Sequence, residues 1–246
     1  MAILAGVGPM GLAAIDYALH SQQKPRRLIV TDIDQQRLDR AASIFSVEAA
    51  AEVGVELAYV NTSSTDKGAE YLRSFTEDEK GFDDVMVFAP VRGLVEEADR
   101  ILASDGCLNF FAGPSDPNFS AELNFYNVHY EATHVVGTSG GNTEDLKEAL
   151  SMIGAGKVNP STMITHIGGL DAVVDTTLDL PDIPGGKKLI YTGIRMPLVG
   201  LEELSQKADE DPLYGELAEI VERHNGLWSA EAESHLMANA KRLKPE

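Results

Sequence analysis

The feature that most constrains the fold is a glycine pattern at the start of the chain. Ala2 to Ala5 is a short apolar run suited to a buried strand, and the sequence GVGPMG follows it at once, from Gly6 to Gly11. Leu12 to His20 then has the composition of a helix. A strand, a tight turn and a helix in this order predict the first half of a βαβ unit. The glycines permit the turn, a close approach to its backbone, and tight packing of the helix on the strand.

The helix after this turn is predicted to begin with a site for anions. Pro9 suits the first helical position, because its φ is already helical and its missing amide is not needed there. The free amides that follow, together with the positive end of the helix dipole, attract phosphate groups. Leu28 to Thr31 is predicted as the next strand, and Asp32 stands at its end, about 20 residues beyond the glycines, as in dinucleotide-binding folds. We therefore expect NAD, whose ribose hydroxyls Asp32 would bind, rather than NADP, whose 2′-phosphate it would repel.

The sequence around Asp32 leaves two alternatives open. The same strand, helix and strand also fit an ordinary βαβ unit in which Asp32 only caps a turn. Arg37 lies in the first turn of a helix predicted to run towards Phe45. Its guanidinium either reaches the adenosine ribose or adenine or belongs to a solvated helix face, and the sequence favours neither.

Apolar strands and helices alternate up to about residue 157. Further strands are predicted at Glu56–Val60, Val85–Ala89, Cys107–Ala112 (after a turn at Asp105-Gly106) and His134–Thr138, and helices at 66–75, 93–103 and 143–153. Strands that are continuous apolar runs belong to sheets covered on both faces. With right-handed crossovers this is an α/β Rossmann fold, a doubly wound parallel sheet of order 3-2-1-4-5-6. The loops at Ala89–Val91 and Ala112–Gly113 would border the nicotinamide.

The alternation stops after residue 157. Strands are predicted at Met163–Ile167 and Lys187–Tyr191, with a helix at Leu170–Thr177 between them. Two more helices follow, at Asp211–Arg223 and after Ser229, whose side chain suits the N-cap of the last one. The chain is therefore expected to end in α+β elements and a helical tail.

Charge and composition narrow the choice of partners. The formal net charge is −19, which argues against nucleic acid, because binding to it depends on clustered Lys and Arg. The apolar runs are too short to cross a bilayer and no secretory leader precedes the first strand, so we expect a cytoplasmic protein without a membrane partner. The single cysteine, Cys107, is predicted to be a thiol of the core rather than a reactive one.

These motifs resemble the medium-chain dehydrogenase/reductase family, the zinc-type alcohol and polyol dehydrogenases. The likeness runs from the glycine motif and Asp32-Ile33-x3-Arg37-Leu38 through the Gly113 loop to Gly156-Lys157-Val158, Thr165-His166 and Lys187-Lys188. Within the family the chain is most similar to the sugar-alcohol and L-sorbose 1-phosphate reductase type. The resemblance implies that NAD is the cofactor and that these residues bind or flank it: Gly6, Gly8, Pro9, Met10, Gly11, Asp32, Ile33, Arg37, Ala89, Pro90, Val91, Ala112 and Gly113.

The resemblance also implies how the chain is divided. We expect a dinucleotide-binding Rossmann domain at 1–157, a remnant of the catalytic domain at 158–199 and the helical tail at 200–246. In the family, a catalytic domain with the zinc ligands lies ahead of the first strand, where this chain has only Met1. No two of the six histidines share a helix face with a third ligand at suitable spacing. No metal site is therefore predicted here, and zinc is expected only in the catalytic domain.

The expected function is that of one half of an enzyme. The chain would be the NAD(H)-binding portion of an alcohol or polyol dehydrogenase that transfers hydride between a secondary alcohol or ketone and nicotinamide. Its substrate would be a sugar alcohol or ketose phosphate. No catalytic residue is assigned, and we expect an inactive fragment when the chain is alone.

Two other functions fit the same sheet. S-adenosylmethionine-dependent methyltransferases have a similar glycine loop, but usually with an acidic residue just before it, where this chain has Ala5. A non-catalytic nucleotide-binding or dimerisation module would also lack zinc ligands. In either case an unpaired edge strand at 134–138 would favour a homodimer.

Overall fold

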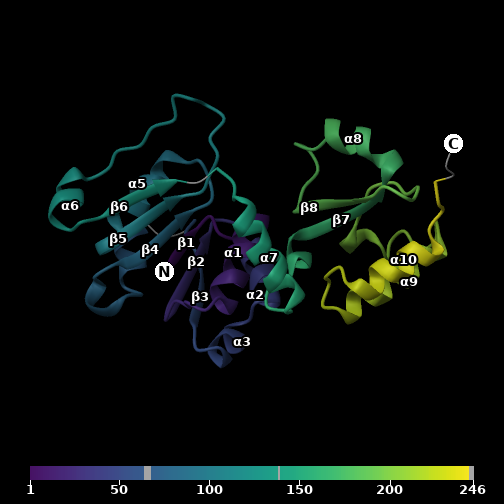
Figure 1. Cartoon of the computed structure of the whole chain (residues 1–246), viewed down its shortest axis with the longest axis horizontal. Coiled ribbons are helices and arrows are strands. Elements are labelled where there is room, and N and C mark those ends of the chain that lie inside the picture. Colours follow the sequence, from purple (N-terminus) through teal and green to yellow (C-terminus); the bar gives the residue numbers. More distant parts are fainter. Residues whose placement is uncertain (64–67, 138, 244–246) are drawn as a thin grey trace. The chain divides into compact units, whose positions relative to one another are not determined.

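The computed structural model describes residues 1–63, 68–137 and 139–243. It consists of two compact units, Met1–Val158 and Asn159–Glu246, and most of their helices and strands are labelled in Figure 1. The division of residues 158–246 into a remnant of a catalytic domain and a separate tail stays a prediction.

The first unit is built on a six-stranded sheet. All neighbouring strands pair in parallel, in the order β3-β2-β1-β4-β5-β6, which confirms the predicted Rossmann fold. The strands are β1 (Ala2–Leu4), β2 (Arg27–Asp32), β3 (Glu56–Asn61), β4 (Phe82–Val87), β5 (Leu102–Phe110) and β6 (His134–Gly137).

Helices cover both faces of this sheet (Figure 1). They are α1 (Pro9–His20), α2 (Gln35–Ile44), α3 (Val47–Glu52), α4 (Gly68–Arg73), α5 (Arg92–Arg100), α6 (Phe125–Tyr130) and α7 (Thr143–Gly154), with a short 3-10 turn η1 (Glu77–Glu79). Side chains of β1 alternate between two apolar clusters. Ile3 packs with Leu12 and Ile15 of α1, whereas Ala2 and Leu4 belong to the cluster of α4 and α5. Both faces are therefore buried, as the apolar runs predict.

Two of the predicted strands, the fourth and the fifth, have other bounds in the structure. The fourth strand spans Phe82–Val87 and so begins and ends earlier than expected. The turn predicted at Asp105-Gly106 lies inside β5, which begins at Leu102. Asp105 has a φ of 60°, and the register between β4 and β5 shifts between Phe82 and Asp84. The strand thus absorbs its turn-forming residues as a bulge and does not end at them.

Further differences concern short helices. The predicted helix at 66–75 is present as Gly68–Arg73, and residues 66 and 67 lie outside the described part, as does Thr138 of the sixth strand. Helices α3 and α6 were not predicted. Each has six residues and a capping side chain, Ser46 and Asn124, which accepts a backbone hydrogen bond.

The connection from β5 to β6 is fastened along α5. We call residues 119–124 the strap. Its odd positions, Phe119, Ala121 and Leu123, pack on the apolar cluster beneath, and its even positions are held by side chains of α5, an alternation typical of an extended chain. Arg92 Nη2 donates to Ser120 Oγ (3.3 Å), and the carboxylates of Glu96 and Asp99 accept from the amides of Glu122 (3.2 Å) and Asn124 (3.0 Å).

The second unit has a small mixed sheet of order β8-β7-β9. Its elements are η2 (Pro160–Met163), β7 (Ile164–Gly169), η3 (Leu170–Ala172), α8 (Val173–Leu178), β8 (Lys187–Tyr191), β9 (Val199–Gly200), η4 (Leu201–Glu203), α9 (Pro212–Arg223) and α10 (Ala230–Asn239). Helices α9 and α10 form the predicted tail, and Ser229 Oγ caps α10 by accepting from Ala232 N at 3.2 Å. Their apolar sides share one core with Ile167 of β7 and with Trp228.

Candidate functional site

The turn between β1 and α1 requires glycine at two positions. A Cβ on Gly6 would lie 2.4 Å from Ile3 Cγ2, and one on Gly11 would lie 2.0 Å from the carbonyl oxygen of Gly6. The Gly6 amide donates to Thr31 O at 2.8 Å. Helix α1 therefore sits directly on the turn, and the turn is bonded to the end of β2.

Gly8 is different, because its backbone is open. Nothing lies within 4 Å of a Cβ placed on it, and its φ of −72° is accessible to any residue. It is the N-cap of α1, no side chain caps the helix, and no acidic residue lies in the first turn. The amides of Met10 and Gly11 have no carbonyl partner within the helix. This open, uncapped helix start has the properties of a phosphate-binding site.

Asp32 lies at the carboxyl end of β2, next to that turn. Its Oδ1 accepts hydrogen bonds from the amides of Ile33 (2.9 Å) and Asp34 (3.1 Å). Asp32 therefore caps its own turn, as one of the two alternatives predicts. Its Oδ2 has no hydrogen-bond partner among the described residues, so one carboxylate oxygen is available to a ligand.

Arg37 is bonded within its own helical turn. Asp34 is the N-cap of α2, and its Oδ1 accepts from the Arg37 amide at 3.2 Å. The other oxygen, Oδ2, lies 3.4 Å from Nε of the Arg37 guanidinium. Asp34 was not among the predicted site residues. The signal was present in the sequence, since an acid followed three residues later by an arginine at a helix start favours this pair.

The loops after β4 and β5 lie at the same edge of the sheet. In the first, Ala89 accepts from the Val91 amide at 2.8 Å, and Val91 precedes α5. In the second, the amides of Phe111 and Ala112 both donate to Val87 O. Because β1 pairs with both β2 and β4, and β4 with β5, the loops containing Pro90 and Gly113 share this carboxyl edge with the glycine turn. The structure thus brings the predicted residues of the cofactor site to one edge.

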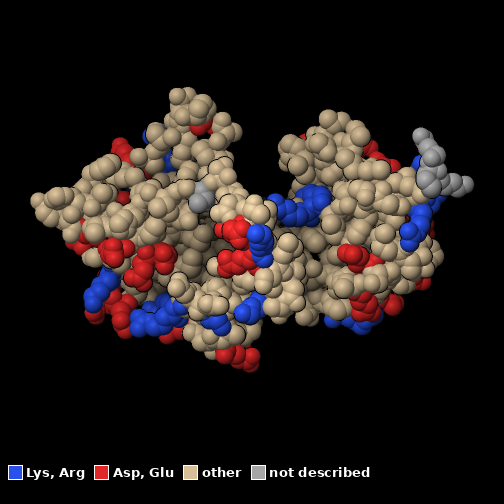
Figure 2. All heavy atoms as spheres, viewed as in Figure 1, with Lys and Arg blue, Asp and Glu red and all other residues tan. Residues whose placement is uncertain are grey.

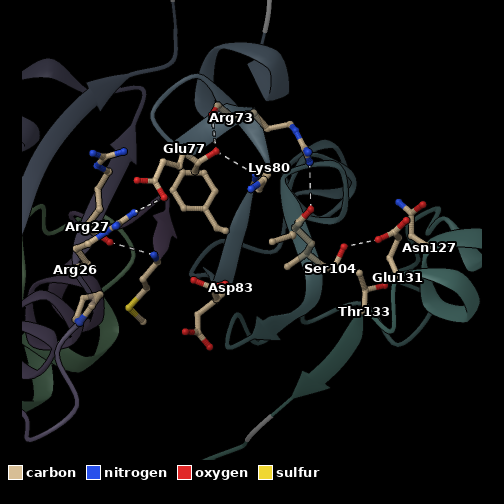
Figure 3. Close-up of a pocket in the computed structure, with 18 of the residues that line it drawn as sticks. Arg26, Arg27, Arg73, Glu77, Lys80, Asp83, Ser104, Asn127, Glu131 and Thr133 are labelled. Carbon is tan, nitrogen blue, oxygen red and sulfur yellow. Dashed lines mark hydrogen bonds and ion pairs between the residues drawn. The ribbon is translucent and has the colours of Figure 1, made fainter.

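A cavity of the first unit lies at the opposite edge of the sheet (Figure 3). It has a volume of about 990 Å³ and is lined by residues that precede or begin the strands, including Arg26, Arg73 and Asp83. Its cations already have partners. Arg26 lies 3.3 Å from Glu77, and Arg73 donates to Leu102 O at 3.1 Å. This groove is polar, internally paired and remote from the glycine turn, so it is not the candidate site.

The charged side chains on one face of the first unit are of both signs (Figure 2). On the face shown in Figure 2, Lys and Arg side chains of the first unit are interspersed with Asp and Glu. Across residues 1–63, 68–137 and 139–243, no group of three or more His, Cys, Asp or Glu side chains could hold a metal ion.

Cys107 is partly buried, and not fully buried as a thiol of the core would be. Burial and the nearby Asp84 raise the pKa of its thiol, which keeps it protonated.

The family to which the chain belongs follows from a match over most of the first unit. The family model described as zinc-binding dehydrogenase matches residues 9–155. The chain belongs to the zinc-binding dehydrogenase family. This confirms the resemblance drawn from the motifs. The part of the chain that the structure describes has no donor set for zinc, so the residues present do not fit that metal.

Three curated proteins are similar to this chain along almost its whole length. An uncharacterised protein of Escherichia coli K12, YggP, is 54% identical over 97% of this chain. A mannitol-1-phosphate 5-dehydrogenase of Aliivibrio fischeri is 52% identical over 96%, and an L-sorbose 1-phosphate reductase of Klebsiella pneumoniae is 47% identical over 97%. The chain spans only 56%, 56% and 55% of their respective lengths.

Solved dehydrogenase structures share the fold. They include 2R,3R-butanediol dehydrogenase of Bacillus subtilis (TM-score 0.60, 17% identity, 78% of this chain and 50% of that one). A short chain alcohol dehydrogenase of E. coli CFT073 complexed with NADH has a TM-score of 0.58 at 18% identity, over 77% and 51% of the two chains. A putative zinc-binding dehydrogenase of Sinorhizobium meliloti 1021 bound to NADP has a TM-score of 0.60 at 20% identity, over 78% and 52%. Both cofactors thus occur among proteins of this fold.

No helix in the described ranges combines the length and the apolar character that crossing a bilayer would take.

Proposed function

We propose that this chain binds NAD(H) at the carboxyl edge of its parallel sheet and serves as the cofactor-binding half of a dehydrogenase. The observation that carries the proposal is the open start of α1 at Gly8, uncapped by any side chain and bonded through Gly6 to the strand that ends in Asp32. Membership of a dehydrogenase family favours a dinucleotide over S-adenosylmethionine at this place.

Each element of the edge has a role in the proposed complex. The amides of Met10 and Gly11 would hold the pyrophosphate, and the space over Gly8 would let it approach. The free oxygen of Asp32, with Ile33 and Arg37 beside it, would hold the adenosine ribose. The loops at Ala89–Val91 and Ala112–Gly113 would flank the nicotinamide. When bound, the nicotinamide accepts or delivers the hydride, while the chain holds it in position.

The substrate proposed is a sugar alcohol phosphate or ketose phosphate. The support is the similarity to a mannitol-1-phosphate 5-dehydrogenase and to an L-sorbose 1-phosphate reductase. The described residues provide neither a zinc donor set nor an assigned acid or base for the reaction. This chain by itself should therefore bind cofactor but turn over negligibly. A cytoplasmic location and the absence of nucleic-acid and membrane partners belong to the same proposal.

Isothermal titration calorimetry with NAD, NADP and S-adenosylmethionine tests the cofactor. We expect NAD to bind more tightly than NADP, and S-adenosylmethionine to give no saturable signal. Tighter binding of NADP or of S-adenosylmethionine than of NAD would contradict the proposed cofactor. Robust dehydrogenase activity of the purified chain would contradict the proposal that it is only the cofactor-binding half of an enzyme.

A variant at Gly8 localises the site. Gly8→Asp should fold normally, since the position is open and Asp is a favoured N-cap. Its carboxylate would occupy the helix amides and repel the pyrophosphate. Loss of one or two charge-assisted hydrogen bonds corresponds to about tenfold to hundredfold weaker NAD binding. Gln206→Glu, which adds the same charge at an exposed position of the second unit, is the matched control and should bind NAD as the unchanged chain does.

A homodimer through β6 is a further part of the proposal. This edge strand is exposed along its length, with Val135 and Val136 about half exposed. Three aromatic side chains of the neighbouring α6, Phe125, Tyr126 and Tyr130, are at least 65% exposed. An unpaired edge with apolar side chains beside it favours strand pairing with a second copy.

A further inference from the structure

Three backbone amides at the start of α2 donate to carboxylates of the chain, and one guanidinium forms an ion pair with a carboxylate. Asp32 Oδ1 accepts from the amides of Ile33 and Asp34 at 2.9 and 3.1 Å. Asp34 accepts from the Arg37 amide at 3.2 Å through one oxygen, and the other oxygen lies 3.4 Å from the guanidinium. Asp32 and Asp34 thus contact the donor groups around the position proposed for the ribose.

A 2′-phosphate would need these same groups. It carries close to two negative charges and has three acceptor oxygens, and an arginine side chain is the group best suited to hold it. Arg37 is the one cationic side chain that the described β2–α2 turn, residues 32–37, provides. With Asp32 and Asp34 ionised, the formal charge of this turn is −1. A phosphate that approached the Arg37 guanidinium would meet the Asp34 carboxylate 3.4 Å from its Nε.

We propose that Asp34 is a second determinant of cofactor choice, because its carboxylate lies beside the Arg37 guanidinium and weakens the attraction of that cation for the 2′-phosphate of NADP. This inference rests on the proposed function of the site. Exclusion of the 2′-phosphate then depends on two carboxylates with different roles. Asp32 repels the phosphate and binds the ribose of NAD, whereas Asp34 offsets the positive charge of Arg37.

Serine at position 34 separates this role from a structural one. Asp34 also caps α2, and Ser caps helices as well as Asp does. Asp34→Ser should therefore leave the helix intact while it releases Arg37. The pair is exposed, with 61% and 44% of the Arg37 and Asp34 side chains accessible, so the helix does not depend on it.

The experiment measures NAD, NADP and adenosine 2′,5′-bisphosphate binding by calorimetry, in buffer of low ionic strength, to five forms of the full chain. These are the unchanged chain, Asp32→Ser, Asp34→Ser, the double variant, and the double variant with Arg37→Gln. Asp34→Ser alone should leave NAD binding within about threefold. Asp32→Ser alone should weaken NAD more than it improves NADP.

The double variant should bind NADP and the bisphosphate about fivefold to tenfold more tightly than Asp32→Ser does, the size expected when an exposed opposing charge is removed. Arg37→Gln should abolish that gain, and 0.5 M salt should reduce it. Equal NADP binding by Asp32→Ser and the double variant would overturn the inference, as would a gain that survives Arg37→Gln. If the unchanged chain bound neither NAD nor NADP, the proposed function itself would fail, which is a different result.

Discussion

The amide of Gly6 donates a hydrogen bond to the carbonyl oxygen of Thr31 at 2.8 Å. One bond thus joins the glycine turn after β1 to the residue before Asp32. It fixes the open helix start, where a pyrophosphate would bind, relative to the carboxylate that would bind the ribose. The proposed site depends on this fixed separation, because both ends of one ligand must be held at once.

The two glycines of the turn should respond differently to alanine. At Gly11 an added Cβ would lie 2.0 Å from Gly6 O, a backbone atom, so α1 must move, at a cost of about 1–3 kcal/mol typical of overpacking. At Gly8 the added carbon meets nothing. Urea denaturation should show Gly11→Ala destabilised and Gly8→Ala close to the unchanged chain. Equal stability of both variants would contradict the described packing.

The strap should loosen when its most buried anchor is removed. Asp99 is 5% exposed and its Oδ2 accepts from the Asn124 amide at 3.0 Å; Asn124 in turn caps α6. Asp99→Ala should therefore speed amide hydrogen exchange at residues 124–130. Glu96→Ala, the matched control, removes the bond to Glu122 and the ion pair with Arg100. Neither contact involves a residue of α6, so α6 should stay protected. Unchanged exchange in α6 after Asp99→Ala would mean that the anchor does not hold it.

The second unit should lose stability as the pH falls through about 6.5. Burial lowers the pKa of His166 in the folded chain, and the nearby Lys188 ammonium lowers it further. The unfolded chain, with an ordinary histidine pKa of about 6.5, then binds a proton that the folded chain does not. Neutral His166 therefore contributes to the free energy of unfolding above about pH 6.5. This contribution is lost as the pH falls from about 6.5 towards the lowered pKa of the folded chain.

Melting curves of the chain at pH 7.5 and 5.8 measure this effect. His166→Gln keeps a polar side chain next to Thr165, which bonds His166 at 2.9 Å, but removes the titration. It should reduce the difference between the two melting temperatures. If the variant and the unchanged chain lost stability equally, His166 would not be the group responsible.

The proposed homodimer should be broken by a charge on the edge strand. Val136→Lys places an ammonium beside the unpaired backbone of β6, a device by which edge strands avoid pairing. Sedimentation equilibrium should show a dimer of the unchanged chain and a monomer of the variant. Val174→Lys, on the exposed side of α8 in the second unit, should remain dimeric. A monomeric unchanged chain would remove this part of the proposal.

The sheet order was predictable because each parallel strand contains a short apolar run, and helices separate these runs along the chain. The strand bounds and the strap could not be predicted, because they depend on contacts between residues far apart in the sequence. Asp105-Gly106 has the chemistry of a turn, yet pairing with β4 draws it into β5 as a bulge. In the strap, residues 119–124, side chains that pack on the core alternate with residues bonded to α5. This pattern could not be predicted without knowing that α5 lies beside the strap.

The site was predictable as a set of positions but not as a set of bonds. Gly6 and Gly11 leave no room for a Cβ, as tight packing of the helix on its strand predicts, and Asp32 is the last residue of β2. The role of Gly8 stays a prediction. That Asp32 bonds its own turn, and that Asp34 bonds Arg37, depends on side-chain rotamers that no spacing rule fixes. The cofactor role of all these residues stays a proposal until a ligand is bound.

The most direct test is a crystal structure of the chain grown with saturating NAD. We predict the pyrophosphate on the amides between Gly8 and Leu12, and Oδ2 of Asp32 within hydrogen-bond distance of the adenosine ribose hydroxyls. An empty edge, or a dinucleotide bound with its ribose away from Asp32, would contradict the proposed site.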